Sequence, residues 1–187
     1  IGKDFSIIAD SGDNPTAGGV GDRADILEEV LRQKINKTLF AGIASKSAYE
    51  ALKDGNDFTL GGTYGGGGPP LKLKADHVYF KNDCAVASVS NTVVIITKLR
   101  RPFHNLKDFT DLKIDLKDFK TLIVKSGYLS PELQSLSAPT FMALTSGAVN
   151  QDIKGIENNN RLQKIYPFQD FNDYSPVVSN GEHLINQ

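Results

Sequence analysis

The segment from Ile7 to Asp22 constrains the fold most, because an apolar run opens there into a loop of carboxylates and glycines. The run at residues 7–9 is typical of a buried strand. Pro15 fixes a turn, and the glycines after it allow backbone conformations that other residues avoid. An apolar stripe at residues 26–31 then indicates a helix, for which Asp22 is the predicted N-cap. The segment therefore predicts a strand, a loop and a helix in direct succession.

The polar residues of this loop form the first candidate site. Ligands of open α/β sheets bind beyond the carboxyl ends of strands, and a helix N-terminus offers unpaired N–H groups. Asp10, Asp13 and Asn14 gather at that point, where Gly18 and Gly19 let another group approach the backbone closely. The same residue types are common in ordinary turns, so a purely structural loop is the alternative interpretation.

Composition limits the class of protein. The 187 residues fit one domain, and 21 basic against 22 acidic residues give no footprint for nucleic acid or for an anionic membrane. The single cysteine, Cys84, excludes an internal disulfide framework and is interpreted as a small apolar residue of a strand. No apolar run approaches the length of a membrane span, which favours a soluble, cytoplasmic protein.

The order of the predicted elements indicates an α/β fold with a mixed sheet. Residues 37–45 form a strand, Ser45 or Ser47 caps a helix that runs to Lys53, and residues 57–61 form another strand, which together give βα units. Residues 71–100 alternate between apolar and polar and predict an antiparallel meander, with helices packed on the sheet. Further predictions are a strand at 122–126, a short helix capped by Ser130, a last strand within 139–148 and an irregular tail over 150–187 that wraps the domain.

The strand at 122–126 carries the second candidate site. Lys125 and Ser126 stand at its carboxyl end, where parallel strands present their ligands. A Ser-Lys nucleophile is disfavoured, because adjacent residues of a strand point to opposite faces. His77, His104 and His183 have no partners at metal-ligand spacing, so no metal ligand is assigned in this chain.

Three other segments are interpreted without a catalytic role. The glycine run at residues 61–68 lacks a Gly-Lys-Ser/Thr ending, so it is interpreted as a flexible or closely approached loop and not as a phosphate loop. Arg100 and Arg101 are expected to form a solvated pair in preference to holding a carboxylate. Residues 103–119 are expected to form a surface connection with one helical turn.

The order of these motifs resembles a known family. The element that carries most of the resemblance is Asp10-x-x-Asp13-Asn14-Pro15 with Gly18-Gly19. Supporting positions are Asp22, Gly61-Gly62, Pro70-Leu71 and Val124-Lys125-Ser126. Together they resemble the C-terminal domain of the microcystinase C (MlrC-like) metallopeptidase family over roughly residues 5–150. Thr16-Ala17 and Ser11-Gly12 depart from the pattern expected for that family.

The resemblance implies a bacterial zinc metallohydrolase that cleaves peptide or amide bonds of small peptides. Its zinc ligands would lie in an N-terminal domain that has no counterpart among these residues, so no cofactor is expected within the chain and that domain is the expected partner. A non-catalytic module that binds a small ligand or another domain is the alternative. By this resemblance the candidate catalytic residues are Asp10, Asp13 and Asn14, and the candidate substrate-binding residues are Gly18, Gly19, Lys125 and Ser126.

Overall fold

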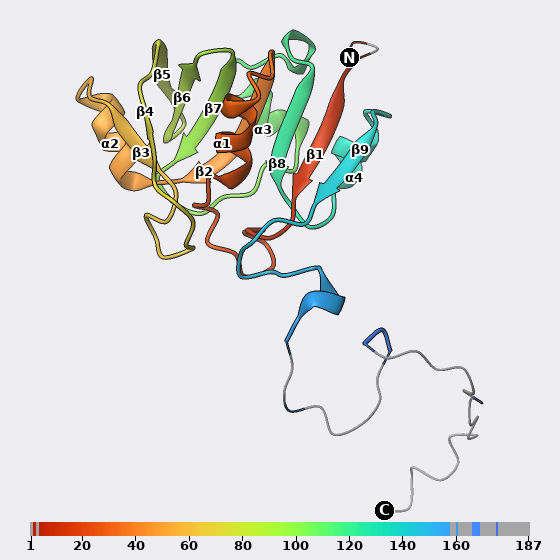
Figure 1. Cartoon of the computed structure of the whole chain (residues 1–187). Coiled ribbons are helices and arrows are strands. Elements are labelled where there is room, and N and C mark those ends of the chain that lie inside the picture. The colour runs from red at the N-terminus through yellow and green to blue at the C-terminus, as the bar shows by residue number, and fades with distance from the viewer. Residues whose placement is uncertain (1, 3, 158–159, 161–165, 169–174, 176–187) are drawn as a thin grey trace, which may run out of the picture. The chain divides into compact units, whose positions relative to one another are not determined.

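The computed structural model describes residues 2, 4–157, 160, 166–168 and 175. The chain divides into two units, residues 1–151 and 152–187, and each is described by itself. The first unit holds the sheets and the four α-helices of the described residues (Figure 1). In the second, a 3₁₀ turn η2 (Ile153–Gly155) begins at Asp152, whose side chain accepts a hydrogen bond from the Gly155 N–H. The predicted wrapping of residues 150–187 falls mostly outside the described residues.

A mixed sheet forms the centre of the first unit, as the sequence predicts, and it has seven strands. Its order is β5-β6-β7-β2-β8-β1-β9. The five strands from β7 to β9 in this order are parallel, whereas β6 runs antiparallel to both β5 and β7. The strands are β1 (Ser6–Asp10), β2 (Thr38–Ala44), β5 (His77–Lys81), β6 (Cys84–Val89), β7 (Thr92–Thr97), β8 (Thr121–Lys125) and β9 (Thr140–Ala143).

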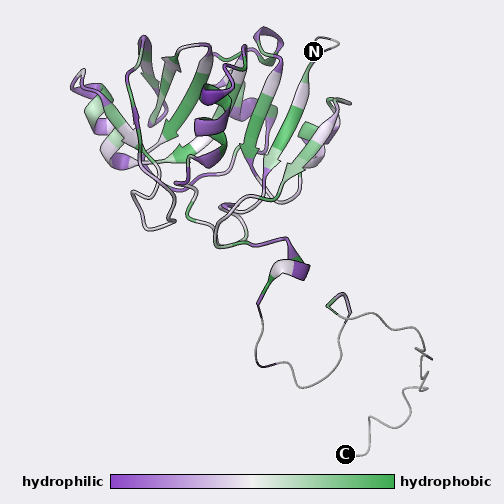
Figure 2. Ribbon diagram, in the orientation of Figure 1, coloured by the Kyte–Doolittle hydropathy of each residue, from purple (hydrophilic) through white to green (hydrophobic). Residues whose placement is uncertain are grey.

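Helices cover both faces of this sheet. On one face, α1 (Asp25–Arg32) and α2 (Lys46–Lys53) pack with a small antiparallel sheet of β3 (Phe58–Leu60) and β4 (Leu71–Leu73). On the other, α3 (Leu106–Thr110), the 3₁₀ turn η1 (Leu116–Asp118) and α4 (Pro131–Gln134) complete a second core. Figure 2 shows the apolar strands between the more polar helices. Burial on both faces explains why β2 has no polar residue after Thr38 and why every one of its residues is buried.

The predicted helix caps at Ser45 and Ser130 are confirmed, and the β5–β6 turn has the backbone that a tight hairpin needs. Asn82 and Asp83 both have positive φ, as the tight hairpin between β5 and β6 requires. Ser45 caps α2 by accepting a hydrogen bond from the Ala48 N–H. Ser130 caps α4 in the same way through the Leu133 N–H. These short polar residues satisfy helix donors that would otherwise lack partners.

The expectation of a surface connection at residues 103–119 is wrong. Phe103 and Phe109 are fully buried, with ring centroids 5.7 Å apart, and Leu112 packs beside them in the same core. The lysines and most aspartates of the segment lie on its outer side. Composition alone therefore suggests an exposed segment, although one of its faces is apolar and buried. Arg101 is also not simply solvated, because its guanidinium forms an ion pair of 2.7 Å with Asp108.

Asp108 makes the stability of this segment sensitive to acid. Burial alone would raise the pKa of its carboxyl, but hydrogen bonds from the Asn105 backbone, Arg101 and the His104 backbone outweigh it, and the pKa lies below the ordinary 3.8. Because the folded pKa is below the unfolded one, the stabilisation is complete above 3.8 and disappears as pH falls through the folded value. We expect Asp108→Asn to lose less stability than the wild type between about pH 6 and pH 2 in urea-unfolding experiments. Equal losses would contradict this assignment.

Cys84 is predicted to be chemically inert in the folded protein. It begins β6, is buried, and burial raises the pKa of its thiol. The thiolate is the reactive form, so both access and ionisation disfavour attack. We expect iodoacetamide to modify Cys84 at least about 100-fold more slowly in the native protein than in urea, as measured by mass spectrometry. Rapid native labelling would show that the β6 end opens readily.

Candidate functional site

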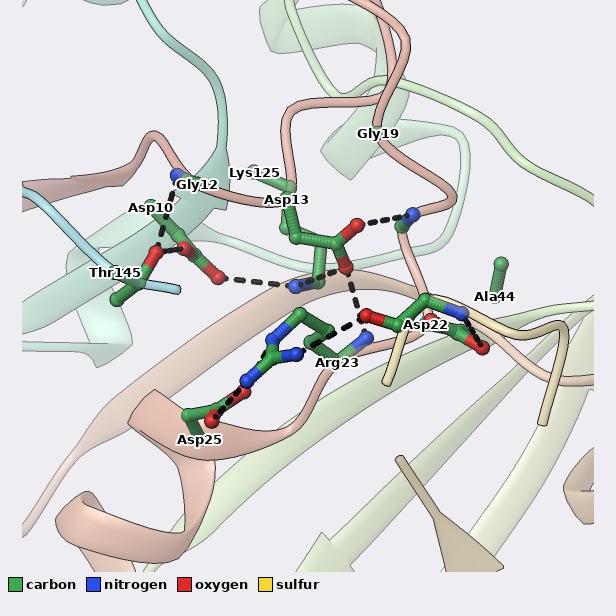
Figure 3. Close-up of polar contacts among 12 residues, drawn as sticks. Asp10, Gly12, Asp13, Gly19, Asp22, Arg23, Asp25, Ala44, Lys125 and Thr145 are labelled. Atoms are coloured by element: carbon green, nitrogen blue, oxygen red, sulfur yellow. Dashed lines mark hydrogen bonds and ion pairs between the residues drawn. The ribbon is translucent and has the colours of Figure 1, made fainter. Parts of the chain in front are cut away.

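Four loops gather at the carboxyl edge of the sheet (Figure 3). β1 ends at Asp10, β8 at Lys125 and β9 at Ala143, and the register places Asp10 opposite both of the other two. The loops after these strands therefore begin side by side. The fourth is the glycine-rich loop 61–68, in which the Tyr64 N–H donates to Asp22 and the Gly66 carbonyl accepts a hydrogen bond from Arg23.

A buried ion triad ties the first two loops together. The Lys125 ammonium lies 3.0 Å from Oδ2 of Asp10 and 3.0 Å from Oδ2 of Asp13. All three side chains are at least 96% buried, so water contributes little to their solvation. Such a triad is stable only when each charge keeps its partners. The structure thus brings together three of the residues singled out in the sequence.

Asp13 also shapes the glycine segment that follows it. Its Oδ1 accepts a hydrogen bond of 2.8 Å from the Gly21 N–H, and its Oδ2 accepts one of 2.8 Å from the Arg23 N–H. Gly18 and Gly21 both adopt positive φ. Gly19 packs so closely on the Asp13–Asn14 backbone that a Cβ would come within 2.6 Å of the Asp13 carbonyl carbon. The carboxylate and the glycines together fix one conformation of the loop.

Asp10 joins the β1 loop to the loop after β9. Its Oδ1 accepts a hydrogen bond from the Thr145 hydroxyl, which in turn accepts one of 3.1 Å from the Gly12 N–H. The Val149 N–H donates to the Gly12 carbonyl at 2.9 Å. Thr145 therefore belongs to the site, although the sequence predicted only that it lies within the last strand region, 139–148.

The side chains of Asn14 and Ser126 make local contacts. Oδ1 of Asn14 accepts hydrogen bonds of 3.0 Å from the Thr16 N–H and 2.8 Å from the Thr16 hydroxyl, in a turn of the kind that Asn favours. The Ser126 hydroxyl donates to the Tyr128 carbonyl. Ser126 therefore stands beside the triad without joining it, and the catalytic or substrate-binding roles of both residues stay predictions.

Asp22 is not the N-cap of α1, contrary to the sequence prediction. The cap position is Ala24, without a side-chain hydrogen bond. The Asp22 carboxylate instead accepts hydrogen bonds from the N–H groups of Tyr64, at 2.5 Å, and Gly66, at 3.4 Å. Backbone donors from a loop more than 40 residues away have displaced the local cap. The glycine run is thus the closely approached loop that its composition suggested.

Arg23 is a residue of this edge that sequence reasoning missed. Its guanidinium forms a bidentate pair with Asp25, at 2.7 and 2.9 Å, and donates to the Gly66 carbonyl at 3.0 Å. The hydrogen bond with Asp25 is the main reason that the pKa of Arg23 is raised. The sequence contained one indication of this role, because Arg23 stands two positions before the carboxylate of Asp25, with which it can pair. The pair holds the glycine-rich loop against the beginning of α1.

The triad does not fit a metal ion. All four carboxylate oxygens of Asp10 and Asp13 accept hydrogen bonds from protein groups, and Lys125 occupies the position between them that a cation would take. Throughout the described part of the chain, no group of three or more His, Cys, Asp or Glu is placed to hold a metal. The arrangement instead provides a rigid, fully hydrogen-bonded support for the loops around it.

Comparisons with known proteins agree with this fold. A family model described as "MlrC C-terminus" matches residues 8–160. A crystal structure from Mesorhizobium sp. BNC1, described as a "Putative metallopeptidase", superposes with a TM-score of 0.68 at 16% sequence identity. The match covers 91% of this chain but only 39% of that one, and at this identity it shows likeness of fold. No curated protein matches the chain. Among the described residues, no helix is long and apolar enough to cross a membrane.

Proposed function

Because the chain belongs to the MlrC C-terminus family, we propose that it is the C-terminal domain of a zinc-dependent peptide or amide hydrolase. In this proposal its carboxyl-edge loops form one wall of a cleft, and an upstream domain forms the other. The observation that carries the proposal is the buried Asp10–Lys125–Asp13 triad, which rigidifies those loops at the edge where α/β folds bind ligands.

The metal would be held by the upstream domain, because the triad does not fit one. In this proposal the chain contributes by holding the loops that position the substrate. Asp10 and Asp13 fix the loops that follow β1 and β9. In this proposal the exposed backbone at Gly18 faces a peptide substrate, whereas Gly19 is buried and supports that backbone through its N–H, which donates to the Asn14 carbonyl. The 39% coverage of the solved metallopeptidase-like structure is consistent with a larger protein in which a second part completes the site.

The proposal is tested on a protein that joins this chain to its upstream domain. We expect stoichiometric zinc by elemental analysis and cleavage of members of a small-peptide library. Asp13→Asn should retain the metal yet lower kcat/KM by about 100-fold, because a displaced loop mispositions the substrate. Asp57→Asn, on an exposed position away from the triad, is the matched control and should be unchanged. Absence of both metal and cleavage in the wild type would refute the proposal.

A binding module without catalysis is the second candidate. It is favoured by the fact that every oxygen of the two central carboxylates already accepts a protein hydrogen bond, which leaves neither poised for proton transfer. A joined protein that binds peptides tightly and cleaves none would establish this alternative. A measurement of peptide cleavage therefore distinguishes the two functions, whereas a measurement of peptide binding does not.

A further inference from the structure

A cavity lies at the carboxyl end of β7, beside the β5–β6 turn and the first residue of α2. It has a volume of about 530 Å³ and includes four cationic residues, Lys46, Lys98, Arg100 and Arg101, in its lining. Asp83 is the only carboxylate among the lining residues. Such an excess of positive charge in a concave surface attracts anions.

Two of the four cations have no carboxylate partner within the described residues. Lys98 pairs with the highly exposed Asp83 at 3.2 Å, and Arg101 pairs with Asp108 at 2.7 Å. In the described part of the chain, neither Lys46 nor Arg100 takes part in an ion pair. Their charges are therefore available to a ligand.

The wall of the cavity contains a buried hydroxyl with unused hydrogen-bonding capacity. Thr97 is 3% exposed, and none of the described residues supplies a partner for its Oγ1. Thr97 stands directly opposite Cys84 in the sheet, so both side chains lie on one face, and both line the cavity. Buried polar atoms normally have partners, so an unpaired hydroxyl on a residue that lines this cationic cavity favours a ligand that accepts hydrogen bonds.

The cavity lies next to the N-terminus of α2 and to the loop that follows β1. Lys46 is the first residue of α2, whose N-terminus carries a partial positive charge. Arg100 donates a hydrogen bond of 3.4 Å to the carbonyl of Gly19, in the loop that follows β1. A ligand held here would thus lie beside the glycine segment at the same edge of the sheet.

From these observations we propose that the cavity binds an oxyanion, the carboxylate or phosphate group of a small ligand. Arg100 and Lys46 supply the uncompensated charge, and the Thr97 hydroxyl donates a hydrogen bond to the anion. Oxyanion binding here does not depend on the proposed hydrolase function, because it is measured on this chain without turnover. Failure of either proposal would leave the other standing.

The test is an NMR titration of the ¹⁵N-labelled 187-residue chain at constant ionic strength. The probes are inorganic phosphate, N-acetylalanine and its uncharged amide. We expect saturable shifts of the amide signals of Lys46 and of residues 97–101 with at least one anion and none with the neutral amide. A response to phosphate alone assigns a phosphate ligand, and a response to N-acetylalanine assigns a carboxylate. No saturable shift with either anion would overturn the proposal.

Variants localise the site. Arg100→Gln and Lys46→Gln should each weaken binding about tenfold, because each removes a charged hydrogen bond. Lys53→Gln, at the other end of α2, is the matched control and should change affinity less than about twofold. Thr97→Val should weaken binding severalfold while leaving the unfolding midpoint unchanged or higher, since it removes an unpaired buried hydroxyl. Equal affinities for the wild type, Arg100→Gln and Lys46→Gln would overturn the proposal.

Discussion

Replacing Lys125 with methionine is expected to lower the free energy of unfolding by about 3–5 kcal/mol. The substitution keeps the apolar stem but removes the ammonium that lies 3.0 Å from each of two buried carboxylates. Asp10 and Asp13 would then face each other as uncompensated charges, without water to solvate them. For a chain of this size the melting temperature should fall by roughly 10 °C, which urea and thermal unfolding can both measure.

The control separates electrostatics from packing. Adding Asp10→Asn and Asp13→Asn to Lys125→Met removes the repulsion, so the triple variant should recover part of the loss. Recovery will be incomplete because an amide cannot reproduce both backbone hydrogen bonds that Asp13 accepts. Lys53→Met, on the exposed end of α2, should change stability by less than about 0.5 kcal/mol. A triple variant less stable than Lys125→Met would show that the charges are not the dominant effect.

The sequence predicted the fold where local signals and burial agree. The apolar runs of β1, β2 and β8 have few alternatives to a buried strand, and the alternation over residues 71–100 predicts the antiparallel pairing of β5, β6 and β7. The mixed sheet follows from these units in order. Residues 103–119 were misjudged because five buried apolar side chains are dispersed among lysines and aspartates, and only tertiary packing shows which face they share.

The sequence predicted which residues belong to the site, but it did not predict which of them form ion pairs with each other. Asp10 and Lys125 each stand at the end of an apolar run, which places both at the carboxyl edge if their strands are parallel. That the strands are also neighbours is a property of the whole sheet, which no local pattern encodes. Asp22 shows the opposite case, because its local capping propensity was overridden by donors from Tyr64 and Gly66.

Replacing Gly12 with alanine is expected to give the second large effect, a loss of about 3 kcal/mol in unfolding free energy. A Cβ at this position would come within 1.9 Å of the Thr145 carbonyl oxygen and 2.8 Å of that of Ser146. Both are backbone atoms, so no rotamer change can relieve the overlap. The loop after β9 would have to move away, and the hydrogen bonds from the Gly12 N–H to Thr145 and from the Val149 N–H to Gly12 would weaken.

Hydrogen exchange distinguishes this local separation from general destabilisation. In Gly12→Ala the N–H of Val149 should exchange faster than in the wild type, while the N–H groups of central β2 keep their relative order of protection. Gly2→Ala is the matched control, because a Cβ there meets no atom within 4 Å. If Gly12→Ala unfolds within about 0.5 kcal/mol of the wild type, the two loops are not held at the close approach on which the Asp10–Thr145 connection depends.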